Sequence, residues 1–123
     1  MDMTEQHFIQ YVNKFGTFQK RSMFGGTGLF RDDAMFALIS AEKIFIRGGE
    51  HLDNELTKLG CEKYRHVKKQ TTATVNYYDI TEMFEARNSR IDELVEQSIK
   101  YSVSERQFKR SAANRRLRDL PNM

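Results

Sequence analysis

The sequence predicts an α+β fold, a two-layer domain in which helices pack on a mainly antiparallel sheet of about six strands. Apolar residues recur at helical spacing near both ends of the chain and once near its middle, and short apolar runs broken by turn residues lie between these segments. The chain has 123 residues, of which 39% are hydrophobic. This length and composition suit one compact folded domain.

An N-terminal helix is expected over residues 3 to 15. Its apolar side chains follow the i, i+3, i+4, i+7 spacing that places them on one helical face. They are Phe8, Tyr11, Val12 and Phe15. Gly16 follows at the position where the helix should end.

Residues 18 to 47 change to short apolar runs that suit strands joined by tight hairpins. The breaks fall at Gly25-Gly26, Asp32-Asp33, Ala41-Glu42 and Gly48-Gly49. Strands are therefore predicted near residues 18–24, 27–31, 34–40 and 43–47.

The second half of the chain begins with a mid-chain helix over residues 50 to 59, with Leu52, Leu56 and Leu59 on one side. Two further strands are expected, one around Tyr64 and one from residue 71 to 78, because these runs are rich in β-branched and aromatic residues. Helical spacing returns after Asp79 and again after residue 89, which predicts C-terminal helices.

The composition argues against several classes of protein. One cysteine, Cys61, cannot form an internal disulfide, and with three scattered histidines it does not make a convincing zinc site. The sequence has no apolar stretch long enough to span a membrane and no signal-peptide pattern at its start. We therefore expect a cytoplasmic protein that has no membrane partner, no bound metal and no cofactor.

The positive charge is concentrated toward the end of the chain. Residues 1 to 88 carry as many acids as bases, so the whole net charge of +3 falls in residues 89 to 123. We divide the chain into an α+β domain at 1–104 and a basic helical extension or linker at 105–123. The candidate partner or nucleic-acid contacts in this extension are Arg106, Lys109, Arg110, Arg115, Arg116 and Arg118. A solvated helix face explains the same residues equally well.

No catalytic group emerges from the sequence. The acidic pairs Asp32-Asp33 and Asp92-Glu93 are adjacent residues that point in different directions, and Cys61 has no base near it in sequence. The basic hairpin at residues 63 to 69 could lie along a phosphate backbone, although lysines that protect an edge strand explain it better.

The glycine cluster has two readings. Gly25, Gly26 and Gly28 are interpreted as fold-determining turn residues, since the Lys-Ser or Lys-Thr that follows a phosphate-binding loop is missing. The rival hypothesis is a small-ligand-binding or enzymatic domain with a pocket near Gly25 to Gly28. A passive dimerisation module, in which two copies form a homodimer through an edge strand or the last helix, is a third alternative.

Four segments carry a resemblance to a known family: residues 21–30 (RSMFGGTGLF), 34–39 (AMFALI), 75–78 (VNYY) and 111–117 (SAANRRL). The chain resembles the N-terminal domain of the TfoX/Sxy family of natural competence regulators, and the last two segments are similar to its Vibrio-type members. The resemblance implies a two-layer α/β fold with an antiparallel sheet and a non-enzymatic transcriptional coactivator of DNA-uptake competence.

The same resemblance implies a partner, the cyclic-AMP receptor protein, at a class of promoters, with promoter DNA as a further partner. Full-length family members carry a second, helical domain after the one resembled here. The family offers no catalytic residues to transfer, so the glycines at 25, 26 and 28 are expected to determine the fold.

Overall fold

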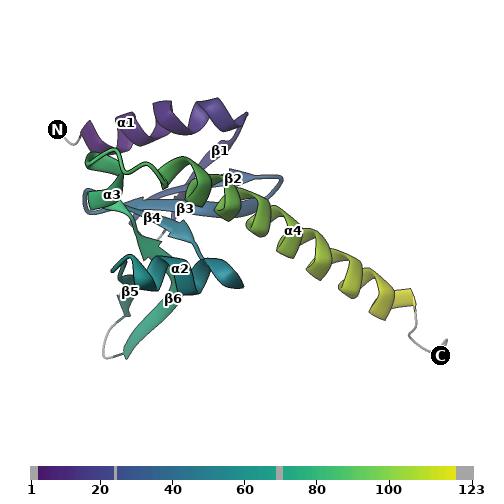
Figure 1. The fold of residues 1–123 in the computed structure, drawn as a ribbon. Coiled ribbons are helices and arrows are strands. Elements are labelled where there is room, and N and C mark those ends of the chain that lie inside the picture. Colours follow the sequence, from purple (N-terminus) through teal and green to yellow (C-terminus); the bar gives the residue numbers. More distant parts are fainter. Residues whose placement is uncertain (1–2, 24, 69–70, 119–123) are drawn as a thin grey trace.

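The computed structural model describes the backbone of residues 3–23, 25–68 and 71–118, and the side chains of residues 4–23, 25–65 and 76–113. It confirms the α+β class (Figure 1). The helical elements are α1 (Met3–Val12), the 3-10 turn η1 (Asn13–Phe15), α2 (His51–Lys58), α3 (Thr81–Glu85) and α4 (Ile91–Arg118). The strands are β1 (Gln19–Met23), β2 (Gly26–Arg31), β3 (Ala34–Ser40), β4 (Lys43–Arg47), β5 (Lys63–Lys68) and β6 (Thr71–Asp79).

The six strands form one sheet in the order β1-β2-β3-β4-β6-β5, and each neighbouring pair is antiparallel. The predicted breaks at Asp32-Asp33 and Ala41-Glu42 are tight turns in which both residues have positive φ, between 49° and 64°. Such left-handed pairs match the twist of the flanking strands, which is why two-residue hairpins use them.

The first helix differs from its prediction. It was expected to run to residue 15, but the α-helix ends at Val12 and the chain tightens into η1 before Gly16, whose φ is 117°. Phe15 still packs against the core from this 3-10 turn, so the apolar spacing identified the correct face beyond the end of the α-helix.

The main core lies between the sheet and the helices. Helices α1, α2 and α4 place apolar side chains on one face of the sheet, which gives the two layers. These helical core residues are Phe8, Val12, Leu52, Leu56, Ile91, Leu94, Val95 and Ile99. A smaller cluster of Leu38, Phe45, Tyr64 and Tyr77 packs separately from that core.

Helix α4 has a docked half and a projecting half. Ser98 is fully buried, and its hydroxyl lies 2.7 Å from the carbonyl oxygen of Arg47 and 3.2 Å from that of Phe36, which ties the helix to β4 and β3. After Glu105 the helix is mostly exposed, and Figure 1 shows it extending away from the sheet toward the C-terminus. The helix runs without a break across residues 104 and 105.

Candidate interaction surface at the junction of helix α4 and the sheet

The basic residues singled out in the sequence begin where α4 leaves the sheet. Arg106, Lys109 and Arg110 are exposed, and their i, i+3, i+4 spacing places them on one side of the helix. Residues 115, 116 and 118 continue the same helix, and their side chains lie outside the described residues.

Arg110 meets the turn between β2 and β3. Its Nη2 atom lies 2.9 Å from Oδ2 of Asp33, and Nη2 of Arg21 on β1 lies 2.9 Å from the other carboxylate oxygen. The Arg21 guanidinium also stacks over the ring of Phe30, with its central carbon 4.5 Å from the ring centroid. Hydrogen bonds from Arg110 and Arg21 hold the pKa of Asp33 below its usual value, so this carboxylate is ionised at neutral pH.

Glu105 forms a second charge cluster one turn earlier. Its carboxylate lies 2.7 Å from Nη2 of Arg47 on β4 and 2.8 Å from Nζ of Lys109. The Glu105 side chain is only 19% exposed, which makes these pairs better shielded from water than those of Asp33. A hydrogen bond from Lys109, together with the charge of Arg47, lowers the pKa of Glu105.

A small cavity of about 230 Å³ separates the two carboxylates. Arg47, Arg106 and Lys109 line it together with Asp33 and Glu105, and Phe30, Met35 and Tyr77 supply apolar walls. Nε of Arg47 is buried and has no hydrogen-bond partner among the described atoms. We name Arg21, Arg47, Arg106, Lys109 and Arg110, with Asp33 and Glu105, the junction cluster.

Sequence reasoning found three cations of the junction cluster and missed the rest. Arg21 and Arg47 lie in strands of a region with equal numbers of acidic and basic residues, and Asp33 was interpreted as a turn residue. The contact between residues 33 and 110 depends on how α4 crosses the sheet, which the local sequence pattern does not contain.

The three glycines lie at a turn and at close approaches between strands. Gly25 has a φ of 76° with open space around it. A Cβ at Gly26 would lie 2.1 Å from the carbonyl oxygen of Ile39, and one at Gly28 would lie 2.8 Å from Sδ of Met35. Because neighbouring protein atoms fill the space at Gly26 and Gly28, the geometry there serves the pairing of β2 with β3.

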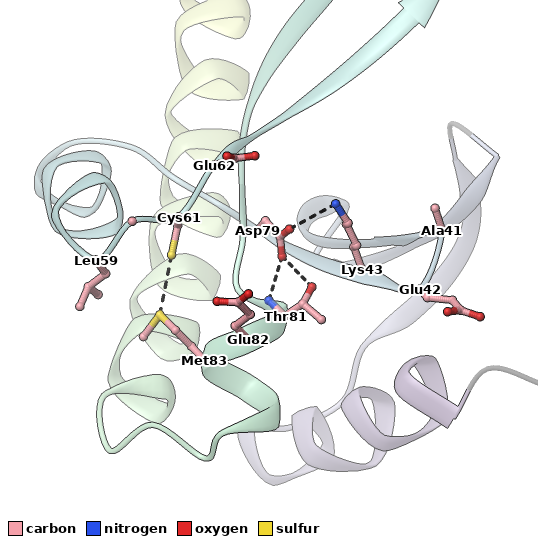
Figure 2. A pocket seen from close by; sticks show the side chains of 11 residues that line it. Ala41, Glu42, Lys43, Leu59, Cys61, Glu62, Asp79, Thr81, Glu82 and Met83 are labelled. Carbon is pink, nitrogen blue, oxygen red and sulfur yellow. Dashed lines mark hydrogen bonds and ion pairs between the residues drawn. The ribbon is translucent and has the colours of Figure 1, made fainter.

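A second hollow, of about 640 Å³, lies between the start of β4, the end of α2 and helix α3 (Figure 2). Asp79 accepts hydrogen bonds from the backbone N–H and the hydroxyl of Thr81, which holds the start of α3. The Cys61 thiol points to Met83, with the two sulfur atoms 3.7 Å apart. Burial raises the pKa of Cys61, so the thiol stays protonated and is a poor nucleophile at neutral pH.

The acidic pair at residues 92 and 93 serves the fold. Asp92 accepts hydrogen bonds from Tyr11 and Lys14, each at 2.7 Å, and so joins α1 to the start of α4. Across the described ranges no group of three His, Cys, Asp or Glu side chains is arranged to hold a metal ion. Within the same ranges, none of the helices combines the length and the apolar character that a membrane span requires.

We predict that the junction cluster weakens in acid. The folded-state pKa of Glu105 is depressed, so its ion pairs stabilise the fold above the ordinary glutamate value of 4.5, and this contribution is lost as pH falls through the lower folded value. The stability difference between the wild type and Glu105→Gln should be largest near pH 7 and should shrink below about pH 4.5. Urea unfolding followed by circular dichroism at a series of pH values measures it, and a difference that grows in acid would contradict the assignment.

The fold and the junction cluster together define a small α+β domain whose last helix carries a basic surface beyond the sheet. Residues 10–102 match the model of the TfoX N-terminal domain, and the chain belongs to that family. The family resemblance read from the sequence is thereby confirmed.

Three curated proteins illustrate the relationship. The chain is 50% identical over 123 residues to DNA transformation protein TfoX1 of Aliivibrio fischeri, which covers 100% of this chain and 59% of the relative. It is 31% identical over 111 residues to DNA transformation protein TfoX of Haemophilus influenzae, covering 88% and 51% of the two chains. It is 28% identical over 114 residues to protein Sxy of Escherichia coli, covering 93% and 54%. The chain thus spans between 51% and 59% of the length of these relatives.

Proposed function

We propose that this chain is a module of a regulator of natural DNA-uptake competence. The observation that carries the proposal is its 50% identity, over all 123 residues, to a protein named for DNA transformation. The regulator works without catalysis, as a transcriptional coactivator of the cyclic-AMP receptor protein at promoters, and therefore in the cytoplasm.

The arrangement of the module suits such a role. In this proposal residues 1–104 are the α+β domain and residues 105–123 are a basic extension toward a further domain, of which residues 105–118 belong to helix α4. Because α4 is one continuous helix from Ile91 to Arg118, the extension is held at a defined angle to the sheet and can present its charges to a partner.

Promoter activation should depend on the basic side of α4. Replacing Arg106, Lys109 and Arg110 with Ala in the full protein removes three exposed cations. Each lost phosphate or carboxylate contact costs on the order of 1 kcal/mol, so three together cost roughly a hundredfold in affinity, and we expect reporter output from a competence promoter to fall by at least about tenfold. A reporter assay with immunoblotting for protein level measures this.

A matched triple variant controls for net charge. Lys58→Ala, Lys63→Ala and Arg65→Ala remove the same charge from α2 and from the basic hairpin, and all three side chains are exposed. We expect this control to retain most of the reporter output. Loss of activation in the control and retention in the α4 variant would move the contact surface to the hairpin. Unchanged output in both would remove these cations from the mechanism.

Capture of the cyclic-AMP receptor protein tests the partner directly. The immobilised full protein should retain the receptor in the presence of cyclic AMP, and adding promoter DNA should increase the amount retained. Absence of capture under both conditions contradicts the coactivator role, whatever the reporter shows.

A further inference from the structure

We propose that Asp33 is an internal counter-ion on a DNA-binding surface, and that a backbone phosphate of double-stranded DNA replaces its carboxylate between Arg21 and Arg110. This inference rests on the proposed function, because action at a promoter brings the module to DNA. It goes beyond that function in two respects. It names double-stranded DNA as the partner of the junction cluster, and it names the Asp33 carboxylate as the group that limits the affinity for DNA.

The geometry around Asp33 is that of an occupied oxyanion site. Arg21 comes from β1 and Arg110 from α4, yet each places one guanidinium nitrogen 2.9 Å from a different oxygen of the same carboxylate. A phosphodiester also presents two non-bridging oxygens to its surroundings, and arginine recognises both groups with the same fork of N–H donors.

The site is accessible to a large partner. The side chains of Asp33, Arg21 and Arg110 are all about half exposed, at 48%, 48% and 53%. Exposed ion pairs of this kind contribute only about 0.2–1 kcal/mol each, so a phosphate that brings a second negatively charged neighbour with it can displace the carboxylate.

Charge around the site favours a polyanion over a single anion. The junction cluster has five cations and two carboxylates, so its formal net charge is +3, equal to that of the whole chain. Arg106 lines the cavity beside Asp33, and among the described contacts it makes no ion pair. The cluster therefore has cations to spare once Asp33 has neutralised part of it.

The spacing along α4 suits a phosphate backbone. Residues 106 and 110 are separated by about 6 Å along the helix axis, and phosphates of one DNA strand follow each other every 3.4 Å or so along the duplex axis. When α4 lies along the duplex axis, one of its turns thus spans about two phosphates, and the helix continues to residue 118 with three more arginines in its sequence.

The two residues of the β2–β3 turn give a matched test. Asp33→Asn and Asp32→Asn each remove one negative charge, and both positions have positive φ, at 64° and 49°, where Asn is readily accommodated. Asp32 forms no ion pair among the described contacts, so only Asp33→Asn releases Arg21 and Arg110. We expect Asp33→Asn to tighten binding of the full protein to a short promoter duplex by about three- to tenfold, and Asp32→Asn by less than about twofold.

The salt dependence of duplex binding shows whether Asp33→Asn acts by releasing Arg21 and Arg110 or only by changing the net charge. Log affinity falls with log salt by about 0.9 per phosphate contacted, so Asp33→Asn, which frees the site for one phosphate, should steepen this slope by up to about 1 while Asp32→Asn leaves it unchanged. Fluorescence anisotropy with labelled duplex, from 50 to 200 mM salt, measures both quantities. Equal affinity and equal slope in the two variants would overturn the proposal.

Arg110→Gln keeps the test informative if Asp33→Asn is poorly folded. Alone it should weaken duplex binding, and in combination with Asp33→Asn it should abolish the gain that Asp33→Asn produces.

Two outcomes separate this inference from the proposed function. If the wild type shows no salt-sensitive binding to duplex while the α4 triple variant still loses promoter activation, the DNA contact is wrong and the proposed function stands. If Asp33→Asn instead strengthens capture of the receptor protein without DNA, the occupant of the surface is a protein and the proposal fails.

Discussion

Gly49→Ala is expected to destabilise the domain by about 2–5 kcal/mol, because two separate costs fall on one residue. The φ of Gly49 is 144°, a conformation that L side chains rarely adopt. A Cβ there would also lie 2.0 Å from Cε1 of Tyr101 on α4, well inside contact distance. The Tyr101 ring or the backbone at Gly49 must shift to make room, and urea unfolding followed by circular dichroism measures the cost.

Gly60→Ala separates the two costs. Its φ is 82°, yet no atom lies within 4 Å of the position where a Cβ would be added. Its substitution should therefore cost only the backbone strain, about 1–2 kcal/mol. Truncating Tyr101 to Ala in the Gly49→Ala background should recover part of the loss. Equal destabilisation by the two glycine substitutions would mean that α4 does not pack against Gly49 in solution.

The contact between Gly49 and Tyr101 also affects the junction cluster. Tyr101 lies one helical turn before Glu105 on α4, and Glu105 holds Arg47 and Lys109. The Tyr101 hydroxyl also hydrogen-bonds to Glu105, so displacing its ring would remove one contact of the carboxylate that pairs with Arg47 and Lys109. The packing of glycine against an aromatic ring thus helps to fix where the basic surface begins.

The strands between residues 19 and 47 could be predicted because their boundaries are local. Turn residues punctuate apolar runs at short intervals, and the expected strands at 34–40 and 43–47 coincide with β3 and β4. Hairpin partners are neighbours in sequence, so antiparallel pairing of β1 through β4 follows from the same pattern.

The long-range contacts could not be predicted in this way. The pairing of β6 with β4 is one such contact, because β5 precedes β6 in the chain and yet lies outside it in the sheet. The edge position of β5 itself agrees with the edge strand that the lysines of residues 63 to 69 had indicated. Ser98 interrupts an apolar helix face and reads as a neutral surface residue, while in the fold its hydroxyl lies within reach of two strand carbonyls. Such contacts arise from the angle at which α4 crosses the sheet.

In the junction cluster, too, the residues that are close in sequence could be predicted and those brought together by the fold could not. Charge counting located Arg106, Lys109 and Arg110 because they are close in sequence. Arg21 and Asp33 joined them only through the fold, since Asp33 and Arg110 are separated by 77 positions. A surface that draws on β1, a hairpin turn and α4 has no signature in any single segment.

Removal of a large apolar side chain should destabilise the domain strongly in the docked half of α4 and hardly at all in the projecting half. Leu94 is fully buried in the main core, and Phe108 is 69% exposed on the projecting half. Leu94→Ala removes buried methyl groups and leaves a cavity, which should cost about 3–5 kcal/mol in free energy of unfolding. Phe108→Ala removes more atoms from a position that packs against little, so its cost should stay within about 0.5 kcal/mol.

Urea denaturation of both variants, with the slope of each transition compared with wild type, tests this division. An unchanged slope with a lowered midpoint for Leu94→Ala is the expected result, because the fold is kept while its core is weakened. The difference in unfolding free energy between the two variants also tests the basic surface of α4. If Phe108 contributed several kcal/mol, the second half of α4 would be packed against the domain. Residues 106 and 110 lie on the side of α4 opposite Phe108, and Arg110 pairs with Asp33. A large cost for Phe108→Ala would therefore mean that α4 is turned with Phe108 toward the domain, which would contradict the junction cluster on which the proposed contacts depend.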